Sequence, residues 1–538
     1  MGQEKKDRPD AGLRSLNHYR NALPTWRYWP REKLLPLVRY ETPYLAWFQD
    51  KIRTPTLDSY FAFTANLGTH TFFMVFLPIL FWCGYTSLGR GMVHILAFGV
   101  FFSGFIKDLL CLPRPLSPPL QRITMSGSAA LEYGFPSTHS TNAVSVAVYA
   151  VALLNSPDCT VSPHLNIFLQ AITYLYVVSI VIGRLYCGMH GFFDVIIGCL
   201  LGALIGIMQF VYGERFDEYL VSGNGKEVLI VVVIILTLVR IHPEPADDCP
   251  CFDDSVAFAG VLIGAEVAYW DFARSSISWT EPSPATVPYR LESLGWIKTI
   301  LRTVLGVTCI VVWREVMKPS LLRVLPPIFR GLERVGLSLP RRFFTRASQY
   351  KTVPTHLKDH DVFPNISEIP SILTNIRHPR RRAVSIGPQS EADAYETLAY
   401  REKRRRESLS SPHGVRGSPA TADHDSKTGL DGRAPTTNPR TPCRLDEYEH
   451  MMGTGTPNYS PIPMAVDVDK NARLSPVVPL DYSIDEPNET EMFSRIKKPR
   501  VRYDVEVVTK LIVYSGIAWI AIEGSPLLFD VVGLGLRQ

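Results

Sequence analysis

The sequence lacks several features that would assign it to a common class of soluble protein. Its nine cysteines are scattered through 538 residues without the paired spacing of a zinc site. The N-terminus reads MGQEKKDRPDAGLRSLNHYR, which is charged and has no short apolar core before a cleavage site. We therefore expect no signal peptide, and the first hydrophobic run would act as the signal. No internal repeat is visible, and the formal net charge is only +5, so we expect no nucleic-acid partner.

Long apolar runs are what the sequence has in abundance. Hydrophobic residues make up 46% of the chain, and the mean hydropathy of +0.06 averages an apolar first part with a polar stretch near the C-terminus. A bilayer core of about 30 Å is crossed by roughly 20 helical residues. We therefore predict an all-α, polytopic transmembrane helical bundle with eight or nine spans. The candidate runs lie around 71–88, 92–111, 140–155, 165–183, 192–212, 227–241, 256–271, 296–314 and 507–523.

Composition divides the chain into six parts. Aromatic residues among arginines and lysines place residues 1–66 at the headgroup level of a membrane. Leucines and arginines at helical spacing indicate that residues 319–347 form an interfacial, amphipathic segment. We expect the prolines of this segment to break it into pieces. Polar and charged residues with few apolar clusters predict disorder in residues 348–503. The parts are an interfacial N-terminal segment (1–66), a transmembrane core with the catalytic motifs described below (67–215), additional transmembrane helices (216–318), the amphipathic segment (319–347), a disordered basic, Ser- and Pro-rich insert (348–503) and a C-terminal transmembrane segment (504–538).

Two features of the insert point to opposite sides of the membrane. Serines follow arginine runs in RHPRRRAVS (377–385) and REKRRRESLS (401–410), which suits basophilic kinases and anionic lipid headgroups. The alternative is that these charges belong to a solvated linker. Asn365 and Asn488 begin the N-x-S/T pattern of glycosylation. Phosphorylation requires the cytosol and glycosylation the lumen, so the sequence leaves the side of the insert open.

Cys249 and Cys251 differ from the other cysteines because they lie in an acidic loop, ADDCPCFDDS. They could form a disulfide, although one intervening residue makes a strained ring, or they could bind a metal. Both alternatives stay open. The cysteines in or beside apolar runs are expected to be inert buried thiols; they are Cys83, Cys111, Cys187, Cys199 and Cys309.

Three cationic side chains border the apolar runs. Lys107 lies inside FFSGFIKDLLCL, Arg114 follows it closely, and Arg184 comes after YLYVVSIVIG. Ionised residues at such positions are costly unless they serve a site or a partner, although Lys107 could snorkel and Arg184 could anchor a helix end. A phosphate that no metal holds needs several fixed donors around its oxygens. The three cations can supply these donors.

Two histidines and an aspartate supply groups for attack and proton transfer. His190 and Asp194 are four residues apart, so on a helix the carboxylate can face the imidazole and fix its tautomer. This primes a ring nitrogen to attack phosphorus and form a phosphohistidine. His139 follows the tripeptide Pro-Ser-Thr (136–138), where free N–H groups at a helix start favour an anion. His139 can then protonate the departing alkoxide and later activate water; otherwise it is an ordinary polar residue at a helix start.

Together the clusters resemble the signature motifs of the type 2 phosphatidic acid phosphatase and haloperoxidase superfamily. The motif K-x6-R-P matches at 107–115, P-S-x-H at 136–139 and R-x5-H-x3-D at 184–194. The resemblance implies His190 as the nucleophile, His139 as the acid and base, and Asp194 as the residue that orients the nucleophile. It also implies chemistry without a metal or other cofactor. The implied phosphate-binding residues are Lys107, Arg114, Ser137, Thr138 and Arg184.

Two positions depart from that family pattern. The sequence around the motifs indicates one subfamily within the superfamily. Thr138 stands where Gly is usual, and Gly183 stands where Ser is usual, so the hydroxyl expected before Arg184 is missing. The segments NLGTHTFFMVFLP, KDLLCLPRPLSPP, GFPSTHS and GRLYCGMHGFFDV closely resemble the sphingoid long-chain base phosphate phosphatases, also called sphingosine-1-phosphate phosphatases. The likeness covers about residues 40–320 and the last span. It implies metal-independent hydrolysis of dihydrosphingosine, phytosphingosine or sphingosine 1-phosphate to the free base and phosphate, by a multi-pass protein of the endoplasmic reticulum bilayer.

Alternation of spans places all three motifs on one face of the membrane. The same count places the insert on that face, where its arginines and lysines argue for the cytosol, whereas the resemblance implies a lumenal site, which we adopt. A broad-specificity phosphatidate or diacylglycerol pyrophosphate phosphatase could use the same site. A transporter lined by intramembrane charge is a further alternative. A membrane scaffold is another, although it gives no reason for intact His139, His190 and Asp194. The preferred base and chain length, the oligomeric state and protein partners stay open.

Overall fold

The computed structural model describes residues 12, 16–67, 70–117, 119–123, 131–157, 159–337, 341–354, 398 and 501–536. These residues are predominantly helical, which confirms the predicted all-α class. Two short strands, β1 (Phe344–Thr345) and β2 (Arg502–Tyr503), pair in parallel. Most of the predicted insert, including Asn365, Asn488 and both arginine–serine motifs, lies outside the described residues.

Eight of the nine apolar runs fall on one continuous helical segment, but the run 71–88 covers the end of one helix, the turn at Cys83–Tyr85 and the start of the next. The described helices are α1 (Leu16–Ala22), α2 (Thr25–Ile52), α3 (Pro55–Leu67), α4 (His70–Trp82), α5 (Thr86–Leu110), α6 (Thr138–Leu154), α7 (Pro163–Tyr186), α8 (Phe192–Ser222), α9 (Lys226–Ile241), α10 (Cys251–Phe272), α11 (Leu291–Arg334), α16 (Val505–Trp519), the π-helical turn η6 (Ile520–Gly524) and α17 (Ser525–Val531). Five segments of the described part are long and apolar enough to cross a membrane: α5, α7, α8, α11 and the α16–α17 unit. The predicted count of eight or nine also needs α4, α6, α9 and α10, and it stays a prediction.

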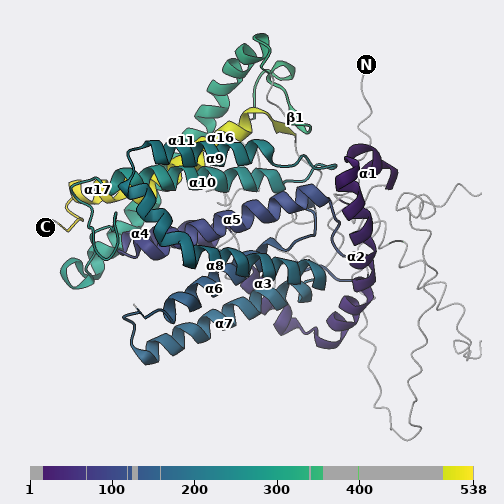
Figure 1. The fold of residues 1–538 in the computed structure, drawn as a ribbon, viewed down its shortest axis with the longest axis horizontal. Helices are drawn as coiled ribbons and strands as arrows, with labels where there is room; N and C mark the ends of the chain where they lie inside the picture. Colours follow the sequence, from purple (N-terminus) through teal and green to yellow (C-terminus); the bar gives the residue numbers. More distant parts are fainter. Residues whose placement is uncertain are drawn as a thin grey trace, which may run out of the picture.

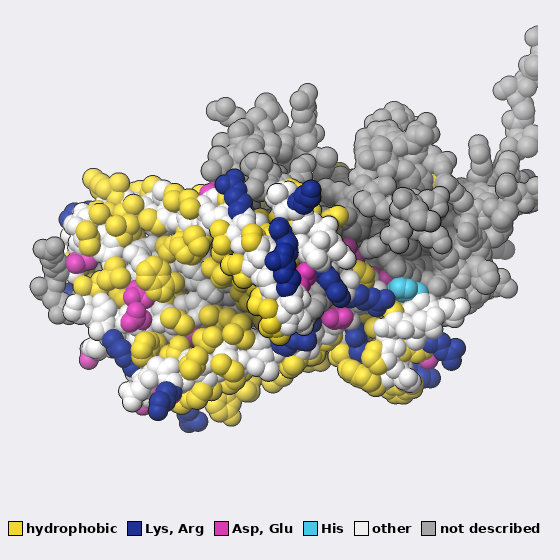
Figure 2. All heavy atoms as spheres, turned by 90° about the horizontal axis from the view of Figure 1, so that it is seen from above, with side chains coloured by type: hydrophobic (Ala, Val, Ile, Leu, Met, Phe, Trp, Pro, Cys, Tyr) yellow, Lys and Arg dark blue, Asp and Glu magenta, His cyan; other side chains and the backbone are white. Residues whose placement is uncertain are grey.

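The surface of the bundle is suited to lipid. Large apolar side chains lie exposed along α7, α8, α9 and α11, among them Ile167, Leu200, Leu229 and Ile297. Hydrophobic side chains cover broad areas of the face in Figure 2. A soluble monomer rarely exposes apolar patches of such extent. Such a surface is suited to contact with the hydrocarbon of a bilayer.

Helix α2 lies across one end of the bundle. In Figure 1 the long helices run alongside one another from left to right, and α2 crosses their right-hand ends. Trp26, Trp29 and Trp47 are more than half exposed, whereas Arg31 and Glu41 are buried against the bundle. Exposed tryptophans beside buried charges suit a helix at the level of the headgroups, as expected for the N-terminal segment.

Close packing of α6 on α8 brings two helix starts together. The glycines at 198, 202 and 206 occur every fourth residue on one face of α8. A Cβ atom at Gly202 would lie 2.2 Å from the carbonyl oxygen of Thr141, and one at Gly198 would lie 2.7 Å from that of Ser137. Small residues let membrane helices approach closely. The glycine face therefore fixes the start of α6 against the first turns of α8.

A buried ion network joins the other end of α5 to α8 and α10. The Arg90 guanidinium donates to Asp217 Oδ1 at 2.6 Å and to Glu266 Oε2 at 2.9 Å. His94 Nε2 lies 2.7 Å from Glu266 Oε1. Buried charges persist only when they are paired and hydrogen-bonded. This network therefore fixes how α5, α8 and α10 align at the end of α5 that is far from the motifs.

The expectation that prolines divide the amphipathic segment was wrong for its first half. Helix α11 continues through Pro319, Pro326 and Pro327 to Arg334, and the non-helical backbone angles inside it occur at Gly295 instead. A proline removes one hydrogen bond and bends a helix, but Leu322, Leu325 and Phe329 are buried in a shared apolar cluster. Packing of this face therefore keeps the helix continuous.

Candidate active site

The predicted site residues gather where α5, α7 and the loop before α8 reach the α2 end of the bundle. Lys107 lies in the last turn of α5 and Arg184 in the last turn of α7. Cys111 takes a left-handed conformation with φ 53° and ends α5, so the chain turns and carries Arg114 back toward His190. Four of the eight predicted side chains come from these elements and are at least nine-tenths buried: Lys107, Arg114, Arg184 and His190.

Arg114 contacts the proposed nucleophile directly. Its Nη1 donates to the Met189 carbonyl oxygen at 2.8 Å and lies 3.1 Å from His190 Nε2. A guanidinium has no acceptor, so Nε2 accepts this hydrogen bond and the ring proton resides on Nδ1. His190 Nδ1 lies 3.6 Å from Asp194 Oδ2, which is an ion-pair distance longer than a hydrogen bond. The geometry therefore leaves a lone pair on Nε2, the nitrogen that faces the cations.

Asp194 is held at the start of α8 by the backbone around it. Its Oδ2 accepts a hydrogen bond from the Gly191 amide at 3.0 Å, and its carbonyl oxygen accepts one from the Ser137 amide at 3.0 Å. Glu41 of α2 also accepts from the Phe193 amide, at 3.1 and 3.2 Å. These bonds satisfy free N–H groups of the first turn of α8. They position Asp194 against the His190 ring.

The start of α6 presents the second motif to the same place. Ser137 is the N-cap residue, and its Oγ accepts from the Ser140 amide at 3.3 Å. Thr138 Oγ1 accepts from Ser103 of α5 at 2.9 Å. His139 is half-buried in the first turn. The free N–H groups of a helix start attract an anion, so this turn complements the cations of the other two motifs.

Electrostatics tie the three motifs together at His190. Burial holds the pKa of His190 well below 6.5, and the positive charges of Arg114, Lys107, Arg184 and His139 lower it further. Residues from motifs more than 70 positions apart therefore lie within electrostatic reach of one ring. The imidazole is neutral at neutral pH, as a nitrogen nucleophile must be.

Among the described residues, the three cations of the site are only sparsely paired. The Arg184 Nε is buried and has no hydrogen-bond partner among the described residues. Lys107 Nζ and Arg114 Nη2 share one partner, Oε2 of Glu132, at 3.3 Å each. The carboxylate oxygen thus lies between two buried cations, and paired cations of this kind can bind the oxygens of an anion.

Sequence reasoning missed Glu132 and the contribution of α2. Glu132 carries no motif signal; what could have indicated it is that two buried cations need a counter-charge when no phosphate is bound. Arg27 of α2 donates to the carbonyl oxygens of Asp108 and Leu109, at 2.5 and 2.9 Å, and so satisfies the last carbonyls of α5. Arg31 donates to the Cys111 carbonyl oxygen at 3.2 Å. The interfacial helix therefore fixes the turn between Lys107 and Arg114.

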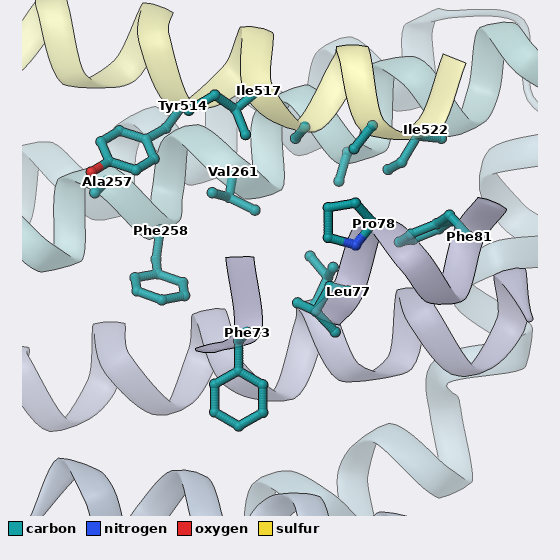
Figure 3. A pocket seen from close by; sticks show the side chains of 14 residues that line it. Phe73, Leu77, Pro78, Phe81, Ala257, Phe258, Val261, Tyr514, Ile517 and Ile522 are labelled. Carbon is teal, nitrogen blue, oxygen red and sulfur yellow. The ribbon is translucent and has the colours of Figure 1, made fainter. Parts of the chain in front are cut away.

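An apolar pocket lies away from this polar cluster. Phe73, Leu77 and Phe81 of α4 face Val261 and Ile517 across it (Figure 3). None of the predicted site residues lines it. Its lining is almost entirely apolar and carries no charged side chain, so it lacks the cations that a phosphate needs.

Comparison with known proteins shows that this cluster lies in the part of the chain that matches a known family. The model of the PAP2 superfamily matches residues 88–216, a range that includes all eight predicted site residues. A dihydrosphingosine 1-phosphate phosphatase of Schizosaccharomyces pombe is 42% identical over 323 residues, which cover 60% of this chain and 77% of the relative. No solved structure matches.

More distant relatives carry the same activity in their names. A dihydrosphingosine 1-phosphate phosphatase of Saccharomyces cerevisiae is 33% identical over 311 residues, covering 58% of this chain and 75% of the relative. The human sphingosine-1-phosphate phosphatase 2 is 26% identical over 299 residues, covering 54% and 73%.

Proposed function

Because this chain belongs to the sphingosine-1-phosphate phosphatases of the PAP2 superfamily, we propose that it hydrolyses sphingoid long-chain base phosphates to the free base and inorganic phosphate. Dihydrosphingosine, phytosphingosine and sphingosine 1-phosphate are the proposed substrates. The observation that supports this most directly is the neutral His190, whose Nε2 faces Arg114 inside a cluster of cations. The reaction uses only side chains and water.

The first half of the reaction transfers the phosphoryl group to the protein. The phosphate displaces Glu132 from Lys107 and Arg114, and Arg184 and the start of α6 bind its remaining oxygens. His190 Nε2 attacks phosphorus, so a P–N bond forms while the P–O bond to the lipid alcohol breaks. His139 donates a proton to the departing alkoxide. Asp194 accepts from Nδ1 and stabilises the charge that develops on the His190 ring.

The second half returns the protein to its starting state. His139, now neutral, takes a proton from water as the water oxygen attacks phosphorus, and the P–N bond breaks. Inorganic phosphate leaves, His190 is neutral again and His139 carries the proton for the next cycle. Lys107, Arg114 and Arg184 stabilise the charge on the equatorial oxygens in both steps.

Glu132 supports the choice of an amine-bearing substrate. A sphingoid base phosphate carries an ammonium group on the carbon next to the phosphorylated one, so its ammonium arrives beside its phosphate. When the phosphate takes over Lys107 and Arg114, the Glu132 carboxylate loses both partners named above, and the ammonium can replace them. A phosphatidate has no amine to offer that carboxylate, so it would gain nothing from this contact.

The location is also part of the proposal. We propose the endoplasmic reticulum membrane with the site facing the lumen, supported by the family resemblance. Glycans on Asn365 and Asn488 would place the insert in the lumen, whereas phosphorylation of Ser385 would place it in the cytosol. Mass spectrometry of the protein isolated from cells distinguishes the two.

Phosphate release by the purified full-length protein in detergent micelles tests the function. We expect dihydrosphingosine 1-phosphate and sphingosine 1-phosphate to be hydrolysed with a kcat/KM at least about tenfold above that for phosphatidate and diacylglycerol pyrophosphate. Comparable hydrolysis of the glycerolipids would favour a broad-specificity phosphatase. No release from any lipid would favour a scaffold, and lipid flux in vesicles without release would favour a transporter.

A further inference from the structure

A second polar cluster lies beside the phosphate site and has no role in the reaction. Asp108 follows Lys107 on α5, but its carboxylate faces Cys249 and Cys251 of the loop between α9 and α10. One ligand atom from each of these three residues lies within 4.8 Å of the other two. Asp108 and Cys249 are 0% exposed and Cys251 is 4% exposed. The cluster is therefore closed to solvent.

The Asp108 carboxylate lacks the partners that burial demands. No nitrogen or oxygen donor among the described residues hydrogen-bonds to either of its oxygens. The nearest ring nitrogen is His242 Nδ1, 3.8 Å from Oδ2. The Cys249 thiol, a weak donor, is the one side-chain hydrogen-bond partner of this carboxylate among the described residues. A buried carboxylate with so little compensation costs several kcal/mol in solvation, and buried carboxylates commonly meet this cost by coordinating a metal. Its orientation toward two thiols points to a metal site.

The two cysteines have the arrangement of metal ligands. Both are free thiols here, and the Cys251 amide points to Cys249 Sγ at 3.5 Å. Thiolates select zinc among the common divalent ions. Around a tetrahedral zinc ion, bonds of about 2.3 Å to sulfur and 2.0 Å to oxygen separate the ligand atoms by about 3.5–3.8 Å. A small contraction of the present cluster reaches those separations.

The charges around the cluster would balance those of a zinc-bound site. Two thiolates and a carboxylate exceed the charge of one zinc ion by a single negative charge. Arg502, Arg341 and Lys107 lie within electrostatic reach of Asp108, so they compensate that excess. Arg502 is itself paired with Asp248 and Asp253 of the same region.

We propose that Cys249, Cys251 and Asp108 bind one structural zinc ion, with His242 beside the Asp108 carboxylate. The ion joins the C-terminal turn of α5, which carries Lys107, to the loop that precedes α10. It takes no part in phosphoryl transfer, which His190 and His139 carry out. Of the two alternatives for Cys249 and Cys251, the geometry favours the metal over the disulfide.

Metal analysis of the full-length protein tests the site independently of phosphatase activity. The protein is produced in zinc-supplemented medium, purified without chelator and analysed by plasma mass spectrometry. We expect about one zinc per chain in the wild type and fewer than about 0.1 in Cys249→Ser/Cys251→Ser. Cys309→Ser is the matched control, because Cys309 lies on α11 outside the cluster, and it should retain about one zinc.

The test remains decisive even if the double variant misfolds. Growth in cobalt should give the wild type and Cys309→Ser the visible absorption of tetrahedral cobalt–thiolate bonds. Wild-type protein with a cooperative melting transition and fewer than about 0.1 zinc per chain overturns the proposal. A Cys249–Cys251 disulfide in that protein, identified by peptide mass spectrometry, also overturns it.

Discussion

Arg114 donates a hydrogen bond toward His190 Nε2 across 3.1 Å. The same guanidinium donates to the Met189 carbonyl oxygen and to Glu132, so it fixes the loop that carries the nucleophile while it faces the phosphate position. One side chain thus connects the first motif of the sequence to the third. It contacts the ring nitrogen that we propose as the nucleophile.

Replacing Arg114 should therefore impair transition-state binding. We expect Arg114→Ala to lower kcat/KM for dihydrosphingosine 1-phosphate by about 10²–10³-fold, since a fixed donor to the developing charge is lost. Arg274→Ala is a suitable control, because Arg274 stacks on Trp270 far along the chain from the motifs. An effect of Arg114→Ala no larger than that of the control would remove Arg114 from the phosphate site.

Asp194→Asn should remove the group that orients the His190 ring without unfolding the start of α8. The amide oxygen of Asn can still accept from the Gly191 amide, so the start of α8 should stay intact, but the negative charge facing His190 Nδ1 disappears. We expect kcat to fall by about two to four orders of magnitude, by analogy with loss of the orienting acid in other histidine–carboxylate pairs. Stopped assays alongside a thermal melt measure both properties. Unchanged turnover would exclude Asp194 from the mechanism.

Glu132→Gln should change substrate choice. The neutral amide no longer pairs with a substrate ammonium, so kcat/KM for sphingosine 1-phosphate should fall about tenfold or more relative to that for phosphatidate. Competition between the two lipids in one micelle measures this ratio directly. An equal effect on both lipids would mean that Glu132 serves only as a counter-charge for Lys107 and Arg114.

The depressed pKa of His190 should appear in the pH dependence of stability. The unfolded chain takes up a proton on this ring near pH 6.5, whereas the folded chain does not until its lower pKa is reached. Stability should therefore fall as pH decreases below about 6.5, by up to about 1.4 kcal/mol per pH unit from this group. His242, whose pKa burial lowers to about 3, acts in the same direction.

Melting temperatures of wild type and His190→Gln in detergent, measured between about pH 7.5 and pH 5.5, test this linkage. The loss of stability on acidification should be smaller in His190→Gln, because that variant has no proton to take up at position 190. Parallel curves for the two proteins would contradict a buried neutral His190.

The sequence predicted the helices and the meeting of the motifs because both depend on local pattern. Each apolar run is long enough to form a helix, and alternation along the chain brings Lys107, His139, Arg184 and His190 to one end. Glu132, Arg27 and Glu41 could not be predicted, since their roles depend on contacts with residues 18 to 152 positions away. The continuity of α11 through its prolines could not be predicted either, because it depends on tertiary packing of the helix against other segments.

The phosphohistidine at His190 is the central claim, and trapping it tests the account most directly. Purified protein is mixed with labelled dihydrosphingosine 1-phosphate, quenched in alkali and digested. The account predicts acid-labile phosphate on the peptide that contains His190, and neither this label nor phosphate release in His190→Ala. Phosphate release by His190→Ala near the wild-type rate would contradict it.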